Sequence, residues 1–160
     1  MTDFEAMKLA LDQARIAFEK DEVPIGAVLL LDGKVIASAH NEVEMLQDAS
    51  AHAEILCLRR AAQNLGGWRL LEATLYCTLE PCAMCAGAMF LYRLKRVVWG
   101  APDLRQGAHG SWIDLRTASH PIHALEIESG LLAEESAQLM KSFFQKRRGE
   151  CVSSKNCLTR

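Results

Sequence analysis

The segment Ile25–Leu31 constrains the fold more than any other part of this sequence. It carries no polar side chain, so a strand formed here needs cover on both faces and belongs inside a sheet. Asp32-Gly33 follows it, a dipeptide typical of a two-residue hairpin turn, and Val35–Ala39 has the pattern of the partner strand. Helices must then cover both faces of the sheet.

Helices and strands alternate along the rest of the 160 residues. Apolar periodicity, Ser50 as a cap and the stop signal Gly66-Gly67 predict helices over residues 3–20, 51–64 and 131–148, and a further helix that Pro81 opens. We predict further strands at Thr74–Thr78, Arg96–Gly100 and Leu125–Glu128, with loops over residues 41–50 and 101–121. An antiparallel hairpin joined to strand–helix–strand units predicts an α/β fold with a mixed sheet.

The length suits one compact domain, which we place at residues 1–150, followed by a flexible tail at 151–160. The net charge of −2 argues neither for nor against a nucleic-acid partner, because local patches decide that. No apolar run is long enough to span a bilayer, and the N-terminus lacks a secretory pattern. We therefore expect a cytoplasmic protein without membrane contact.

Residues at the starts of two predicted helices indicate a metal site. Cys82 and Cys85 are three residues apart, which puts both sulfurs on one helix face, and the helix N-terminus favours their thiolate forms. His52 stands at the start of the other helix. Two thiolates and one imidazole make three ligands, the number typical of a catalytic zinc site that keeps a position for water.

Glu54 follows His52 by two residues, about 200° around a helix, so we do not expect it to be a fourth ligand on the same face. In the first helical turn both side chains can still border one cavity. A carboxylate beside a metal-activated water can take its proton and pass it to a leaving nitrogen. We predict this proton-transfer role for Glu54.

The same residues allow other interpretations. A C-x-x-C pair also occurs in thioredoxin-like redox sites, but that interpretation leaves His52 and Glu54 without a use. A structural zinc site needs a fourth ligand, and none is evident. Cys57 and Cys77 fall on the far side of a helix and in mid-strand, where we predict buried small side chains.

The chain resembles bacterial tRNA-specific adenosine deaminases over about residues 4–150. The zinc-deaminase signature H-x-E…P-C-x-x-C is present in Ala51-His52-Ala53-Glu54 and in the segment that begins at Pro81. Other matching stretches are Glu22-Val23-Pro24-Ile25-Gly26-Ala27-Val28, Ala73-Thr74-Leu75-Tyr76, Thr78–Met89, Arg96–Ala101, Gly107-Ala108, Gly110-Ser111, Phe143-Phe144 and Arg147-Arg148.

The resemblance implies conversion of adenosine to inosine at the wobble position (34) of a tRNA anticodon. One Zn²⁺ per subunit would activate a water that attacks C6, with Glu54 moving the protons. It also implies the three-layer α/β/α fold of cytidine deaminases around a central mixed five-stranded sheet, and a homodimer. Asn41 matches the family residue that hydrogen-bonds the target base, and Asp103 matches a position near the ribose of the anticodon loop.

Two other functions stay open. A zinc-dependent deaminase of a free base or nucleoside (guanine, cytosine or adenosine) would share the metal site without needing a basic C-terminal helix. A zinc-stabilised RNA-binding or partner subunit, which is not an enzyme, would have no use for Glu54. The resemblance favours the tRNA enzyme, with an anticodon stem-loop as its partner.

Two surfaces on the last two helices predict partners. Basic residues of the last helix can neutralise RNA phosphates: Lys141, Lys146, Arg147 and Arg148. The neighbouring Phe143 and Phe144 either stack on unpaired bases or pack in the core. A run of large side chains on the Cys82–Tyr92 helix offers more apolar surface than one buried face needs and predicts a dimer: Met89, Phe90, Leu91 and Tyr92.

The chain departs from the family at Trp99, Pro102, His109 and Trp112. All but Trp99 lie in the segment expected to face the substrate. These departures therefore concern RNA contacts more than the zinc chemistry, and His109 is the one further histidine that we connect with substrate.

Overall fold

One mixed sheet forms the centre of the molecule. A computed structural model describes residues 1–117 and 120–153, the last three in their backbone only. In this part of the chain five strands lie in the order β2-β1-β3-β4-β5. β1 pairs antiparallel with β2 and β3, whereas β3, β4 and β5 run parallel. The strands are β1 (Gly26–Leu31), β2 (Lys34–His40), β3 (Thr74–Leu79), β4 (Arg96–Ala101) and β5 (Glu126–Ser129).

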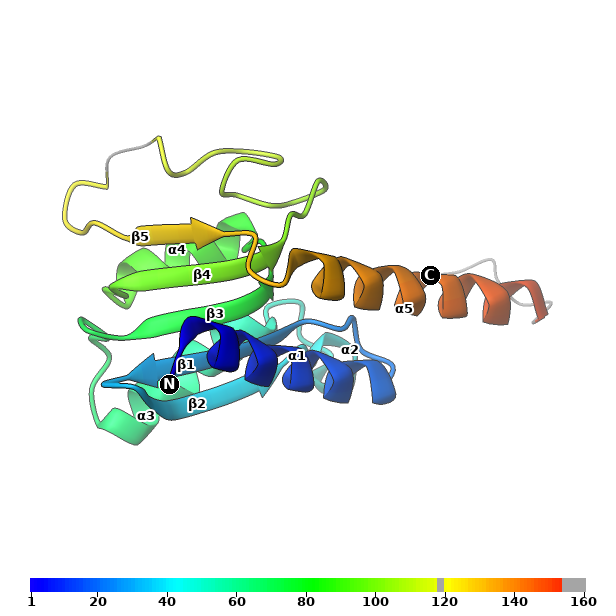
Figure 1. The fold of residues 1–160 in the computed structure, drawn as a ribbon, viewed down its shortest axis with the longest axis horizontal. Coiled ribbons are helices and arrows are strands. Elements are labelled where there is room, and N and C mark those ends of the chain that lie inside the picture. Colours follow the sequence, from blue (N-terminus) through cyan, green and yellow to red (C-terminus); the bar gives the residue numbers. More distant parts are fainter. Residues whose placement is uncertain (118–119, 154–160) are drawn as a thin grey trace.

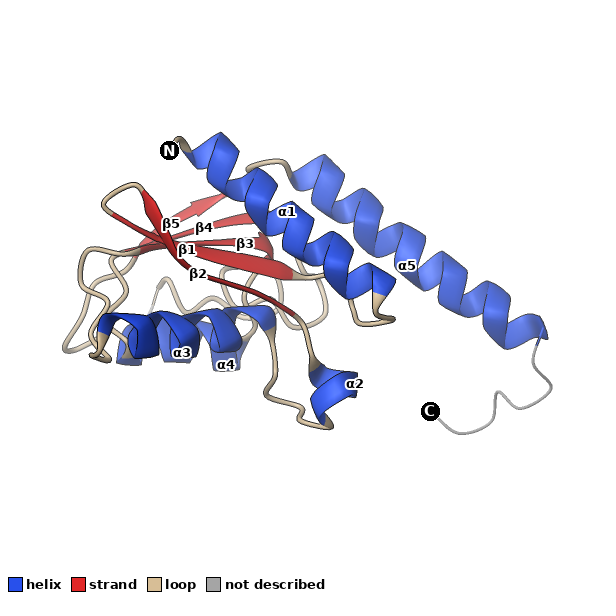
Figure 2. Cartoon of the chain, turned by 90° about the horizontal axis from the view of Figure 1, so that it is seen from below, coloured by secondary structure: helices blue, strands red, loops and turns tan. Residues whose placement is uncertain are grey.

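Helices cover both faces of the sheet, as Figure 2 shows. On one face lie α1 (Asp3–Glu19) and α5 (Ala133–Ser153), and Figure 1 shows α5 running beyond the ends of the strands. On the other face lie α3 (Ala53–Leu65) and α4 (Ala83–Leu91), with the short α2 (Val43–Leu46) on the same side. The predicted three-layer α/β/α fold is confirmed.

Strand β1 supplies side chains to two separate cores. Ala27 and Leu29 belong to the core shared with α3 and α4, whereas Val28 and Leu30 belong to the core under α1. All four side chains are at most 5% exposed. The interior position predicted for this strand is therefore confirmed, and the sheet is covered on both faces where the site is built.

The hairpin turn between β1 and β2 follows the prediction from its sequence. Asp32 and Gly33 both adopt positive φ angles, 49° and 71°, as a two-residue primed turn requires. The strand pairing shifts by one residue between Leu29 and Leu30, so a bulge interrupts the otherwise regular ladder.

Several predicted boundaries were wrong, and tertiary contacts give the reason. Residues 41–50 contain α2, because the Glu22 carboxylate accepts the backbone N–H groups of Glu44 and Met45. Ser50 is not the cap of α3, since its hydroxyl donates to Asp48. His52 is the N-cap there, and Cys82 is the N-cap of α4, whose first residue is Ala83 rather than Pro81.

The C-terminal helix extends beyond its predicted end near residue 148 and runs to Ser153. The part of the predicted flexible tail at residues 154–160 lies outside the described residues, so the division at residue 150 stays a prediction. None of the described helices is long and apolar enough to cross a membrane.

Candidate metal centre

The three predicted ligands come from two helix starts on one side of the sheet. His52 and Cys82 are the extended N-cap residues of α3 and α4, and Cys85 lies within the first turn of α4. Although 30 and 33 residues of sequence separate them, each sulfur is 3.6 Å from His52 Nδ1. All three candidate ligand atoms lie within 4.8 Å of one another.

These distances fit a zinc ion. Zinc–sulfur bonds of about 2.3 Å and zinc–nitrogen bonds of about 2.05 Å, at the tetrahedral angle, separate a sulfur and a nitrogen ligand by about 3.6 Å. That value matches both nitrogen–sulfur distances. The soft donor set also favours zinc over harder divalent cations such as magnesium.

The protonation chemistry of the cluster favours a cation. The pKa of Cys82 is lowered to about 4, because Cys85 and His52 donate hydrogen bonds to its sulfur. The same interaction with Cys82 raises the pKa of His52. A thiolate at the head of a helix is the form that ligates a metal, and a bound divalent cation would favour that form for Cys85 as well.

Glu54 lies beside the cluster without belonging to it. Its side chain is 3% exposed, and no described group hydrogen-bonds its Oε2 atom. Burial raises the pKa of this carboxyl to about 7, an effect that the nearby His52 partly opposes. A buried acid with a free oxygen and a pKa near neutrality suits proton transfer in both directions.

A pocket of about 280 Å³ opens onto the ligands. His52 and Cys82 line it together with Ala49, Ala83, Met84, Gln106 and Trp112. Trp112 is 59% exposed and Met84 is 40% exposed, so apolar side chains border the pocket at its surface. A planar base entering here would reach the metal ligands between these side chains.

The two predicted substrate residues lie outside the lining of this pocket. Asn41 is buried, and its amide nitrogen donates to Glu22 over 3.0 Å. Asp103 lies in the segment after β4, where its backbone N–H donates to Glu80 and its carboxylate accepts from Arg105. The geometry therefore brings His52, Cys82, Cys85 and Glu54 together but does not bring Asn41 or Asp103 into contact with them.

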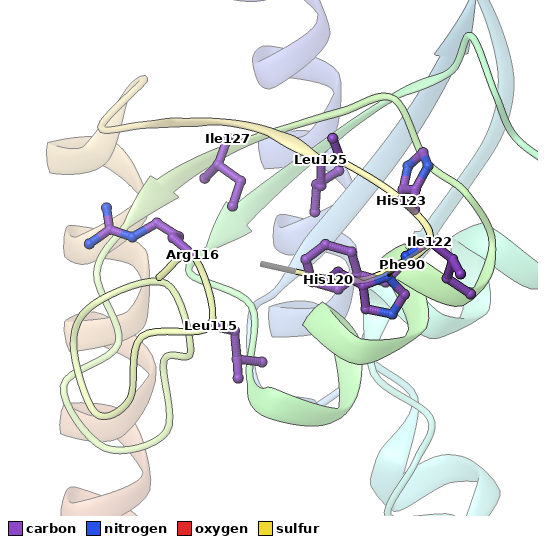
Figure 3. A pocket seen from close by; sticks show the side chains of 9 residues that line it. Phe90, Leu115, Arg116, His120, Ile122, His123, Leu125 and Ile127 are labelled. Carbon is purple, nitrogen blue, oxygen red and sulfur yellow. Dashed lines mark hydrogen bonds between the residues drawn. The ribbon is translucent and has the colours of Figure 1, made fainter. Parts of the chain in front are cut away.

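A larger pocket of about 650 Å³ lies elsewhere, near the β5 edge of the sheet (Figure 3). The histidines and the arginine that line it already have partners among the described residues. The His120 ring stacks on Phe90 at 4.7 Å, His123 bonds the carbonyl of Leu94, and Arg116 pairs with Asp114. None of the predicted metal ligands lines this pocket, so its size does not mark the reactive site.

Other side chains singled out in the sequence serve the core. Cys57 and Cys77 are fully buried, as predicted, and Trp99 is 7% exposed in the same core. Phe143 is 1% exposed and meets Phe18 edge to face, so it is a core residue rather than a stacking platform for RNA.

The basic residues of α5 lie at the surface, and two of them contact Asp21, just after α1. Lys146 pairs with the Asp21 carboxylate, and Arg147 donates to the backbone carbonyl of Asp21. Lys141 and Arg148 are exposed.

Two buried carboxylates that organise the site were not predicted from the sequence. Glu22 holds Asn41 and the start of α2, and Glu80 holds the segment after β4. Both are 1% exposed. A signal was available for Glu80, since an acidic residue directly between a buried strand and Pro81-Cys82 must find hydrogen-bond donors when it is buried.

Comparison with known proteins identifies the family. The family model of the MafB19-like deaminases matches residues 1–148. The tRNA-specific adenosine deaminase of Bacillus subtilis is 48% identical over 142 residues, which cover 89% of this chain and 88% of that protein. The chain belongs to the tRNA-specific adenosine deaminases. A solved structure from a study of A-to-I editing by tRNA:A34 deaminases is 49% identical to this deaminase, with a TM-score of 0.78 over 84% of this chain and 98% of the other.

The deaminase also resembles part of a much longer plant protein. It is 46% identical over 157 residues to the chloroplastic tRNA(adenine(34)) deaminase of Arabidopsis thaliana, and the match covers 88% of this chain but 12% of that protein. The shared unit is therefore the deaminase domain, which contains the candidate metal-ligand cluster and the neighbouring Glu54.

Proposed function

We propose that this deaminase hydrolyses adenosine to inosine at the first anticodon position of a tRNA, with His52, Cys82 and Cys85 holding one Zn²⁺. The observation that carries the proposal is the 3.6 Å spacing of His52 Nδ1 from both sulfurs, which fits zinc, beside a buried Glu54 oxygen that has no partner among the described residues. Zinc bound there would lower the pKa of a water to about 7 and so supply the nucleophile for C6.

Glu54 carries the protons of the reaction. Its carboxylate accepts a proton from the attacking water and donates it to the ring nitrogen next to C6. It then takes the proton of the new C6 hydroxyl and passes it to the amino group, which leaves as ammonia. The overall reaction consumes one water and releases one ammonia, so Glu54 returns to its starting state. Its pKa of about 7 allows both steps near neutral pH.

Asn41 and Asp103 serve the substrate in this proposal. Because Glu22 accepts from the amide nitrogen of Asn41, the amide oxygen is the atom that faces a donor on the target nucleotide. Asp103 lies after β4, close to where parallel strands end and ligands commonly bind. The exposed Trp112 and Met84 flank the route that a flipped-out base takes to the metal.

A basic surface on α5 is available to bind the phosphates of the RNA backbone. Lys141 and Arg148 are exposed on α5, and Lys146 and Arg147 extend the same charge beside the end of α1. Each such residue that neutralises a phosphate strengthens binding in low salt and makes it salt-dependent.

A second copy of the chain is the proposed partner of the apolar face of α4. Leu91 is 65% exposed there, and it lines an apolar surface pocket together with Ile55, Met84 and Phe90. Met89, which the sequence analysis placed in this surface, is fully buried instead and contributes to the core. The proposed dimer thus adjoins the metal pocket, since Met84 borders both. A cytoplasmic location stays a prediction.

An inosine assay tests the function. Purified protein is incubated with an anticodon stem-loop that carries adenosine at the first anticodon position and, separately, with free adenosine, guanine and cytosine. Inosine in the stem-loop alone supports the proposal. Ammonia released from a free base or nucleoside would show that the proposed substrate is wrong and the proposed metal chemistry right. RNA binding without any turnover would indicate a binding subunit.

Glu54→Gln removes the proton carrier while leaving the ligands in place. We expect it to retain zinc and to lose roughly a hundredfold to ten-thousandfold in kcat. The control is Glu72→Gln, which alters an exposed carboxylate paired with Lys95 and should leave turnover unchanged. Near wild-type turnover by Glu54→Gln would exclude the assigned role.

A further inference from the structure

Glu80 is a buried acid that the reaction described above does not use. It directly follows β3 and lies two residues before the metal ligand Cys82. Its side chain is 1% exposed, and no described lysine or arginine pairs with it. A carboxylate in such a position needs several hydrogen-bond donors to offset the loss of water.

In the described part of the chain, the hydrogen-bond donors to the Glu80 carboxylate all come from one segment, residues 103–111. Oε2 accepts from the backbone N–H of Asp103 at 3.0 Å and from the Ser111 hydroxyl. Oε1 accepts from the backbone N–H groups of His109 at 2.9 Å and Ser111 at 3.1 Å. One side chain thus holds both ends of a nine-residue connection.

The backbone that directly follows Glu80 reinforces the same contact. The N–H of Ala108 donates to the carbonyl of Pro81 over 2.8 Å, and Gly107 forms a bridge with Cys82. Gly107 fits only because it has no side chain, since a Cβ atom there would lie 2.4 Å from the Glu80 carboxyl carbon. The metal-ligand segment and the segment after β4 are therefore packed backbone to backbone.

This segment borders the metal pocket. Gln106 and the adjoining Trp112 line the pocket with His52 and Cys82, and Asp103 begins the segment. A shift of the segment would move these side chains relative to the metal ligands. Displacement of positioning groups by as little as about 1 Å can slow a reaction by about a hundredfold.

We propose that Glu80 is a positioning residue, whose carboxylate holds residues 103–111 and the adjoining Trp112 against the metal pocket so that this segment meets the RNA beside the target base. This inference rests on the proposed function. Glu80 acts through the segment and touches neither substrate nor metal. A carboxylate is required because both of its oxygens only accept hydrogen bonds. In a glutamine, the NH₂ group would replace one oxygen and would face an N–H or O–H donor of the segment.

The test is Glu80→Gln, with Glu72→Gln as the control at the opposite end of β3. We expect the zinc content to remain at one per chain. We expect KM for the anticodon stem-loop to rise by roughly tenfold to a hundredfold, the factor that corresponds to losing one hydrogen bond to a charged group, with a smaller change in kcat. Unchanged KM, or loss of zinc, would overturn the proposal.

Hydrogen exchange measures the positioning without any turnover. In Glu80→Gln the amides of Asp103, His109 and Ser111 should exchange at least about tenfold faster, while those of α4 keep their wild-type protection. Equal acceleration in both places would show general destabilisation and would overturn the proposal.

Ser111→Ala gives a milder variant in case Glu80→Gln does not fold. It removes the hydroxyl donor and keeps the backbone N–H bond to Glu80. We expect the stem-loop KM to rise by roughly tenfold, the lower end of the range for Glu80→Gln, because one hydrogen bond to the carboxylate is lost and no donor is turned toward the segment; no rise would overturn the proposal. If the wild-type protein forms no inosine, the proposed function is wrong. The hydrogen-exchange rates and the affinity for the stem-loop then still test the role of Glu80.

Discussion

His109 makes the stability of this deaminase depend on pH in a way that can be calculated. The ring is 2% exposed, and neither ring nitrogen has a partner among the described residues. Burial lowers the pKa of His109 to about 4, since it disfavours the imidazolium; Glu80 and Asp114 oppose this effect and Arg116 adds to it. The ring is therefore neutral in the folded protein over most of the physiological range.

The sign follows from proton binding in the two states. Between pH 6.5 and 4 the unfolded chain binds a proton at His109 and the folded protein does not, so stability is complete above pH 6.5 and falls as the pH drops toward 4. With pKa values of 6.5 unfolded and about 4 folded, the loss between pH 7 and pH 5 is about 2 kcal/mol.

His109→Ala and His109→Gln remove the titrating ring. Each has its own pH-independent effect on stability, through a cavity or an altered hydrogen bond, and this effect cancels when the same protein is compared at two pH values. The free energy of unfolding is measured in urea at pH 7 and pH 5, at one fixed zinc concentration. We expect the wild type to lose about 2 kcal/mol more than either variant.

Equal losses in all three proteins would refute the reasoning, because a ring that protonates as easily folded as unfolded contributes nothing to the pH dependence. A larger loss in both variants would mean that the folded protein holds the charged ring. His109 would then have an acceptor such as the nearby Asp114.

Three further predictions concern other parts of the molecule. Hydrogen bonds from Arg96 and Tyr76 lower the pKa of Asp3 to about 2. The contribution of the Asp3 carboxylate to the free energy of unfolding is therefore present above about pH 4 and is lost as the pH falls toward 2. Because the carboxylate is 40% exposed, Asp3→Asn should lower the unfolding free energy by only about 1 kcal/mol at pH 6 and by less at pH 3, as measured by urea titration. Cys77→Ser places a hydroxyl in a fully buried site and should destabilise by about 1–3 kcal/mol in the same assay; an unchanged midpoint would contradict it. Leu91→Asp should convert the proposed dimer to monomer in light scattering, whereas a monomeric wild type would exclude that dimer.

The fold was predictable where local patterns and buried faces coincide. The unbroken apolar run of β1 requires cover on both faces, and the Asp32-Gly33 turn sets an antiparallel partner for it. Helix limits were less predictable. Neither Ser50 nor Pro81 marks its helix start, because the extended residues His52 and Cys82 take the N-cap positions.

The chemistry of the site was predictable from the sequence, whereas the hydrogen bonds that hold the loops around it were not. Spacing alone indicated that Cys82 and Cys85 share a helix face, and the number of ligands indicated a catalytic site. It gave no sign of the hydrogen bonds by which Glu22 and Glu80 hold the surrounding loops, because their partners lie 19 to 31 residues away along the chain.

The sequence by itself determined the donor set of the metal centre, the buried strand and the alternation of helices and strands, since all three depend on residue type and short-range periodicity. Only the tertiary structure decided that His52 and the two cysteines meet at 3.6 Å, that Glu54 is buried with an oxygen free, and that Phe143 belongs to the core. These features depend on packing between segments that are distant in sequence, where burial selects contacts that no local pattern encodes.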